Sequence, residues 1–108
     1  MKLTNDALLT QLGYNVTDNT LKDLEIIEKN TAGFENIRNH IVALNDHLKV
    51  LDGYIAMSNT NPYLKIKLIS TKKEEIEAGL EEIHKWAKKY KVELKKVNDK
   101  TFYIIGVK

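Results

Sequence analysis

Two segments of the chain place apolar residues at the spacing of an α-helix. Between residues 37 and 51 the apolar positions advance by three or four residues, which aligns them on one side of a helix that is predicted to end at Gly53. The same spacing returns between residues 76 and 90, where Thr71 and Glu74 predict a capping box at the helix start. The two stripes consist of Ile37, Ile41, Leu44, Leu48 and Leu51, and of Ile76, Leu80, Ile83, Ala87 and Tyr90.

Two shorter helices are predicted before these. Thr4 and Thr17 are both residues of the kind that caps a helix N-terminus, and Gly13 between them predicts a left-handed stop. The first helix follows Thr4 and the second runs from Thr17 to Asn30. Apolar pairs that flank each cap predict hydrophobic staples, namely Leu3 with Leu8 and Val16 with Leu21.

After Gly53 the hydrophobic period changes to two, which indicates β-strands. Residues 54–58 and 63–69 predict a hairpin around the turn residues 59–62, and residues 92–97 and 101–107 predict another around residues 98–100. In the last strand, residues 102–105 are apolar on both faces, which is typical of a strand that is covered on both sides or central in a sheet.

This order of elements predicts an α+β fold. Three N-terminal helices precede a ββαββ unit, whose four strands we expect to form a mainly antiparallel sheet packed against helices. With 108 residues the chain has the length of a single domain, 1–108, comprising a helical part (1–52) and the ββαββ part (53–108). Gly79 interrupts the last helix, which suggests either the close approach of another backbone or simple tolerance.

Composition narrows the range of functions. The chain contains no cysteine, which excludes disulfides, thiolate metal sites and cysteine nucleophiles. The N-terminal stretch turns polar at Thr4, and no run of residues approaches the roughly 18 apolar residues that span a bilayer. We therefore expect a cytoplasmic protein that does not enter a membrane.

The charges are unevenly distributed along the chain. The net charge is +2, but residues 1–61 carry five basic and eight acidic residues, whereas residues 62–108 carry twelve basic and seven acidic ones. The asymmetry has two interpretations, a basic binding face or an attraction between the two halves of one fold. Sixteen of the seventeen basic residues are lysine, which lacks the planar fork that reads guanine edges, so sequence-specific DNA recognition is disfavoured.

Few residues offer a catalytic or metal-binding arrangement. His40 and His47 lie on one predicted helix, but seven residues separate them by roughly 10 Å, too far to share a metal ion. We expect both to be boundary packing residues, with Asp46 on the opposite side, and His84 and Trp86 to lie at the rim of the core. A helix-turn-helix within residues 8–27 is disfavoured because its second helix is acidic. We expect neither a cofactor nor a metal ion.

The most informative pattern is an alternation of tyrosine and lysine in the predicted sheet. Tyr63, Lys65 and Lys67 share one face of their strand, and Lys95 and Tyr103 join them if the two hairpins pair in the required register. Such a face has three interpretations: an ordinary solvated or helix-covered sheet surface, a protein-binding surface, or a surface that stacks bases and attracts a single-stranded nucleic acid.

We therefore expect a non-enzymatic adaptor or regulatory protein–protein interaction module that acts as a monomer or homodimer. The alternative is a weak single-stranded nucleic-acid-binding protein that uses the same five residues. A third candidate, a small-molecule sensor, requires a cavity between the helices and the sheet.

Overall fold

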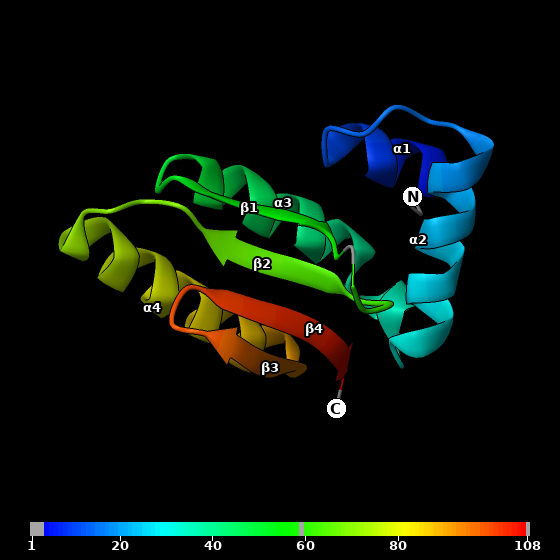
Figure 1. Ribbon diagram of the computed structural model, residues 1–108. Coiled ribbons are helices and arrows are strands. Elements are labelled where there is room, and N and C mark those ends of the chain that lie inside the picture. The colour runs from blue at the N-terminus through cyan, green and yellow to red at the C-terminus, as the bar shows by residue number, and fades with distance from the viewer. Residues whose placement is uncertain (1–3, 59, 108) are drawn as a thin grey trace.

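The fold is α+β, as predicted, in a computed structural model that describes residues 4–58 and 60–107 (Figure 1). A short 3₁₀ turn, η1 (Phe34–Asn36), is inserted between the second and third predicted helices, and the order of elements otherwise matches the prediction. The predicted staple residue Leu3 and turn residue Asn59 lie outside the described residues. The elements are α1 (Asn5–Gln11), α2 (Asp18–Asn30), α3 (Arg38–Lys49), β1 (Gly53–Met57), β2 (Leu64–Leu68), α4 (Lys73–Tyr90), β3 (Val92–Asn98) and β4 (Thr101–Val107).

The sheet joins the two predicted hairpins through their second strands. Its order is β1-β2-β4-β3, and every pair of neighbours is antiparallel. The apolar strand β4 is therefore central, which was one of its two predicted positions. An isolated parallel bridge between Ala32 and Gly106, with the Val107 amide donating to the Ala32 carbonyl (2.8 Å), attaches the end of β4 to the segment after α2.

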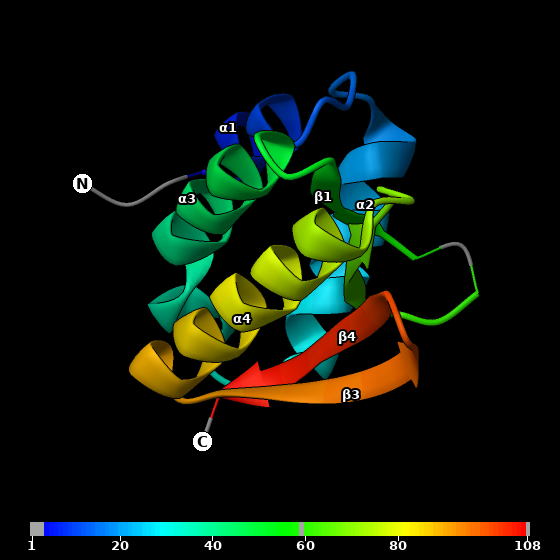
Figure 2. The same ribbon diagram turned by 90° about the vertical axis from the view of Figure 1, so that its left-hand side faces the viewer.

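Two helices cover one face of the sheet. In both views α3 and α4 lie side by side on the same side of the sheet, which is behind the strands in Figure 1, and no labelled helix crosses the opposite face (Figures 1 and 2). The burial pattern of β2 agrees, because Leu64, Ile66 and Leu68 are buried toward the helices while Lys65 and Lys67 are half-exposed on the other side. Helices α1 and α2 lie at one end of the sheet instead (Figure 1).

The helix N-termini confirm two of the three predicted caps. Thr4 accepts a hydrogen bond from the Ala7 amide, and Thr17 forms a reciprocal capping box with Thr20. The predicted capping box at Thr71 and Glu74 is wrong, because α4 begins at Lys73 and its N-cap Lys72 makes no side-chain cap.

Ser70 replaces that capping box. Its hydroxyl accepts the Lys72 amide (3.1 Å), while its carbonyl accepts the Lys100 ammonium from the β3–β4 turn (2.9 Å). A serine that bonds the amide two residues ahead satisfies a backbone donor outside the helix, so α4 starts after this turn and not at Thr71.

The side chain of Leu68 explains why positions 53 and 79 are occupied by glycine. This side chain of β2 is fully buried, and a Cβ at Gly79 of α4 would come within 2.7 Å of its Cδ2. Gly79 therefore accommodates a side chain, which is neither the close approach of a backbone nor the simple tolerance that its position in the sequence suggested. A Cβ at Gly53 would likewise come within 2.9 Å of Leu68 Cδ2. The helix predicted to end at Gly53 ends at Lys49, and the left-handed residue after it is Asp52 (φ 55°).

The single arginine connects the helical segments. The side chain of Arg38 is only 7% exposed, and its guanidinium lies 2.8 Å from the Glu28 carboxylate of α2 and 2.9 Å from that of Glu35 in η1. It also donates to the side-chain oxygen of Asn5 in α1 and lies 5.2 Å from the centroid of the Phe34 ring. One side chain thus reaches α1, α2 and η1 from the first turn of α3.

We predict that Arg38→Met lowers the free energy of unfolding by about 3–5 kcal/mol, because it leaves the largely buried carboxylate of Glu28 without its guanidinium. Urea unfolding measures the change. The matched control is Lys29→Met, which removes an exposed ion pair to Glu25 (3.9 Å) and is expected to change stability by about 0.5 kcal/mol or less. Equal losses in the two variants contradict a central role for Arg38.

Candidate functional site

The strand register assembles the predicted tyrosine and lysine residues on the helix-free face of the sheet. Lys65 of β2 lies opposite Tyr103 of β4, and Tyr103 lies opposite Lys95 of β3. Directly opposed residues of antiparallel strands point to the same side, so these three form a row across the sheet. The sequence alone did not predict how the two hairpins are aligned, and the pairing of β2 with β4 establishes that alignment.

Tyr63 and Lys67 lie on either side of that row. The Tyr63 ring is half-buried, with its centroid 6.0 Å from that of Tyr103. Lys67 pairs with Tyr54 in β1 and with Thr101 in β4. We call the surface formed by Tyr63, Lys65, Lys67, Lys95 and Tyr103, together with Tyr54 and Thr101, the lysine–tyrosine face.

The sequence interpretation missed Tyr54 and Thr101 as members of this face. A signal for Tyr54 was present, since it alternates with the buried Gly53 and Ile55 and therefore points away from the helices. The sequence gives no comparable indication for Thr101. This residue is polar but buried, and only its pairing with Lys67 shows that it belongs to the lysine–tyrosine face.

The lysines of this face have no acidic partner among residues 4–58 and 60–107. No carboxylate oxygen of these residues lies within 4.0 Å of the amino groups of Lys65, Lys67 or Lys95, whereas the neighbouring Lys96 lies 3.7 Å from Asp99. Three such cations at neighbouring positions produce a positive local potential that attracts anionic groups.

The ion pairs also bear on the uneven distribution of charge. Each lysine of the second half that forms an ion pair within the described part of the chain has its partner in the same half, as Lys73 with Glu77 and Lys85 with Glu81. Direct pairing between described lysines of the second half and carboxylates of the first half therefore does not neutralise the basic surplus, which stays at the surface.

Tyr103 is the best-anchored residue of the face. Its hydroxyl oxygen accepts hydrogen bonds from Asn61 Nδ2 (3.0 Å) and Ser58 Oγ (3.4 Å), and lies 3.3 Å from Thr60 Oγ1. The hydrogen bonds with Ser58, Thr60 and Asn61, in decreasing order of effect, and to a smaller extent the charge of Lys65, lower the pKa of Tyr103 from 10.0 to about 8 because they favour the phenolate. The residue is only 9% exposed, so its ring presents little free surface. Its hydroxyl holds the β1–β2 turn in place through the bonds with Ser58 and Asn61.

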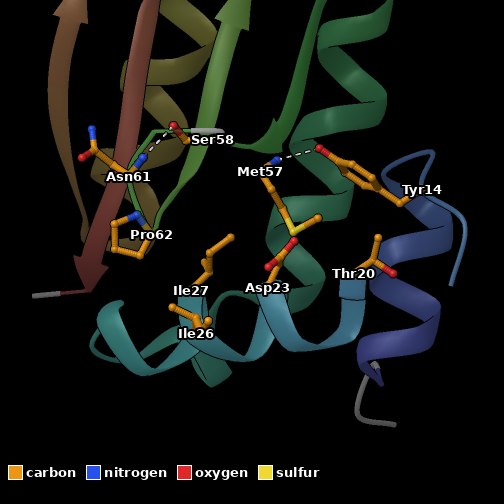
Figure 3. Close-up of a pocket in the computed structure, with 9 residues that line it drawn as sticks. All are labelled: Tyr14, Thr20, Asp23, Ile26, Ile27, Met57, Ser58, Asn61 and Pro62. Atoms are coloured by element: carbon orange, nitrogen blue, oxygen red, sulfur yellow. Dashed lines mark hydrogen bonds between the residues drawn. The ribbon is translucent and has the colours of Figure 1, made fainter. Parts of the chain in front are cut away.

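A pocket lies on the other side of the same turn (Figure 3). It has a volume of about 340 Å³ between α2 and the β1–β2 turn, and Ser58 and Asn61 contribute both to its wall and to the hydrogen bonds with Tyr103. Figure 3 also shows the Tyr14 hydroxyl accepting the Met57 amide (2.9 Å) at its upper edge. The remaining lining residues are Thr20, Asp23, Ile26, Ile27 and Pro62.

The histidines lie at packing or surface positions. The His40 ring stacks on Tyr90 with centroids 3.7 Å apart, and the His40 backbone carbonyl accepts a hydrogen bond from the Trp86 indole N–H (3.0 Å). His47 is exposed and lies 3.6 Å from Glu82, whereas Asp46 pairs with Lys49. Trp86 is 8% exposed and belongs to the core itself. Within the described ranges, no three histidine or acidic side chains converge as metal ligands would.

Comparison of the chain with protein-family models, curated proteins and solved structures finds no match. Among the residues that the structure describes, no helix combines the length and apolar character needed to cross a bilayer.

We predict that tyrosinate absorption in a pH titration reveals Tyr103 ionising with a midpoint near pH 8. The difference between wild type and Tyr103→Phe isolates this transition, and Asn61→Ala is expected to raise its midpoint toward 10.0 because a donor to the phenolate is lost. A difference spectrum with no transition below pH 9 contradicts the hydrogen-bonded arrangement.

The same shift has a consequence for stability. Since the pKa is lower in the folded protein than in the unfolded chain, the stabilising contribution of Tyr103 is complete above pH 10 and is lost as the pH falls through about 8. Wild type is therefore expected to gain stability relative to Tyr103→Phe as the pH rises between these values.

Proposed function

We propose that this protein is a non-enzymatic protein–protein interaction module, an adaptor or regulator, whose lysine–tyrosine face binds an acidic protein surface. The observation that carries the proposal is the row of Lys65, Tyr103 and Lys95, extended by Lys67, on a sheet face that no helix of the described chain covers. Tyrosine is enriched at protein interfaces because it combines a large apolar ring with a polar tip.

The accessibility of the aromatic rings favours a protein partner over a nucleic acid. Binding of single strands depends on bases that stack on exposed aromatic rings. Tyr103 is almost fully buried and its hydroxyl is engaged by the β1–β2 turn, which leaves the half-buried Tyr63 and Tyr54 as the aromatic contacts. Arg38, the only arginine, is buried in the helical half and contributes nothing to phosphate or base recognition on this face.

Lysines of this kind contribute more to the rate and selectivity of association than to affinity. Lys65 and Lys67 are half-exposed and Lys95 is exposed, so solvent screens each interaction with a partner carboxylate. Complementary charge nevertheless accelerates encounter and excludes basic partners. We therefore expect a salt-sensitive association in which Tyr63 and Tyr54 supply the apolar contact.

We predict that Lys65→Glu/Lys67→Glu weakens binding of an acidic peptide at least about tenfold, because two attractive charges become repulsive. Fluorescence anisotropy measures binding of a labelled peptide that alternates glutamate with apolar residues, at two salt concentrations. The control variant Lys72→Glu/Lys73→Glu makes the same change of net charge at the start of α4, and is expected to retain binding.

A single-stranded oligonucleotide of the same net charge is measured in parallel, with light scattering to report the mass of each complex. Tighter, steeply salt-dependent binding of the oligonucleotide favours the nucleic-acid alternative and counts against a protein partner. If both double variants lose peptide affinity equally, only net charge matters and the lysine–tyrosine face is not the site.

A further inference from the structure

A second surface, on the opposite side of the sheet, combines apolar lining residues with a basic rim. It lies between the second half of α4 and strand β3, which meet at Lys91 and diverge toward the β3–β4 turn (Figure 2). The groove between them has a volume of about 540 Å³, within the range of roughly 300–1,000 Å³ that is usual for small-molecule sites. We call it the α4–β3 groove.

The geometry of the chain opens this groove. Lys91 adopts the left-handed conformation (φ 57°) as the cap of α4, and β3 begins at the next residue, so helix and strand are joined at one end. Two irregularities in the pairing of β3 with β4, at Glu93/Leu94 and at Lys96/Asn98, interrupt the regular register of this edge strand. Such bulges bend a strand and increase its twist.

The floor of the groove is apolar. Val92 and Phe102 are largely buried beneath it, Ala87 and Leu94 are half-buried along its walls, and the His84 ring meets Phe102 edge-on with centroids 5.6 Å apart. Burial of a hydrocarbon chain on these side chains would remove apolar surface from water, which favours binding.

The charged groups around this floor are all basic. Lys88, Lys91 and Lys96 line the groove, and no carboxylate of residues 4–58 and 60–107 does. Among the described residues, neither Lys88 nor Lys91 has an acidic partner within 4.0 Å, and Lys96 contacts only the almost fully exposed Asp99. An exposed pair of this kind is weak, so Lys96 can exchange Asp99 for another anion.

Local structural roles account for part of this arrangement. Lysines in the last turn favour the negative end of the helix dipole, and lysines on an edge strand discourage pairing with another chain. Neither role explains why the half-exposed apolar side chains of Ala87 and Leu94 line the groove together with these lysines. A ligand that joins one anionic head to an apolar chain explains the floor and the rim together.

We propose that the α4–β3 groove binds a small anionic amphiphile, a single alkyl chain ending in a carboxylate, free in solution. The chain lies over Leu94 and Phe102, and the carboxylate lies among Lys88, Lys91 and Lys96. The site is independent of the lysine–tyrosine face, because Leu94, Lys96 and Phe102 point toward the helices while Lys95 and Tyr103 point away from them.

The test is calorimetric titration of the full chain with decanoate below its micellar concentration, with the shift in melting temperature measured on the same samples. We expect saturable binding that weakens at least about tenfold in Lys88→Glu/Lys96→Glu, since two exposed attractive contacts become repulsive. Lys65→Glu/Lys67→Glu makes the same change of charge on the other face and is expected to bind decanoate as wild type does. Both lysine pairs are partly or fully exposed, and circular dichroism verifies that each variant is folded.

Further ligands separate the contributions of head and chain. Butanoate, which lacks six methylenes, is expected to bind more than about tenfold more weakly, and decyltrimethylammonium, which reverses the head charge, is expected to bind more weakly than decanoate. The proposal is overturned if decanoate does not bind, if Lys88→Glu/Lys96→Glu binds it unchanged, or if Lys65→Glu/Lys67→Glu loses it equally. Binding only to vesicles of anionic lipid, or only to an acidic peptide, also overturns it.

Discussion

The buried guanidinium of Arg38 is the interaction on which the helical half depends. Helices α1 and α2 are short, and helices of this length are only marginally stable in isolation. Arg38 connects them to α3 through Asn5 and Glu28 and orders the η1 turn through Glu35. Lysine has no planar fork with which to satisfy several acceptors at once, so the position of the one arginine follows from its chemistry.

The placement of α1 and α2 has a consequence for the sheet. Because these helices lie at its end and α3 and α4 cover one face, no helix of the described part of the chain covers the opposite face (Figures 1 and 2). The alternation of side chains along the central strands then places apolar residues on the face toward the helices and lysine and tyrosine residues on the opposite face. Ile66 and Phe102 enter the core, while Lys65 and Tyr103 face outward.

The β1–β2 turn connects three parts of the molecule. Its residues Ser58 and Asn61 bind the hydroxyl of Tyr103 on the lysine–tyrosine face and also line the pocket against α2. Tyr14, which follows α1, anchors the end of β1 in the same pocket through the Met57 amide. A ligand or partner that displaces this turn therefore changes the surroundings of Tyr103 as well as the pocket.

Local pattern was sufficient to predict the four helices, the four strands and the sides to which most of their residues point, although not the start of α4. The stripe through Ile41, Leu44 and Leu48, and the caps at Thr4 and Thr17, depend on residues within a turn or two of one another. For the same reason, the outward direction of Lys65 and Lys67 was predictable from alternation alone.

What only the tertiary structure decided is which outward residues become neighbours. Sliding one strand past another by two residues keeps every side chain on its face, so alternation cannot distinguish the observed pairing of Lys65 with Tyr103 from its alternatives. The same limit applies to Ser70, whose contact with Lys100 helps define the start of α4, and to Gly79, whose size is explained by Leu68 of a distant strand. Each depends on contacts between segments far apart in sequence, and no periodicity within a segment encodes them.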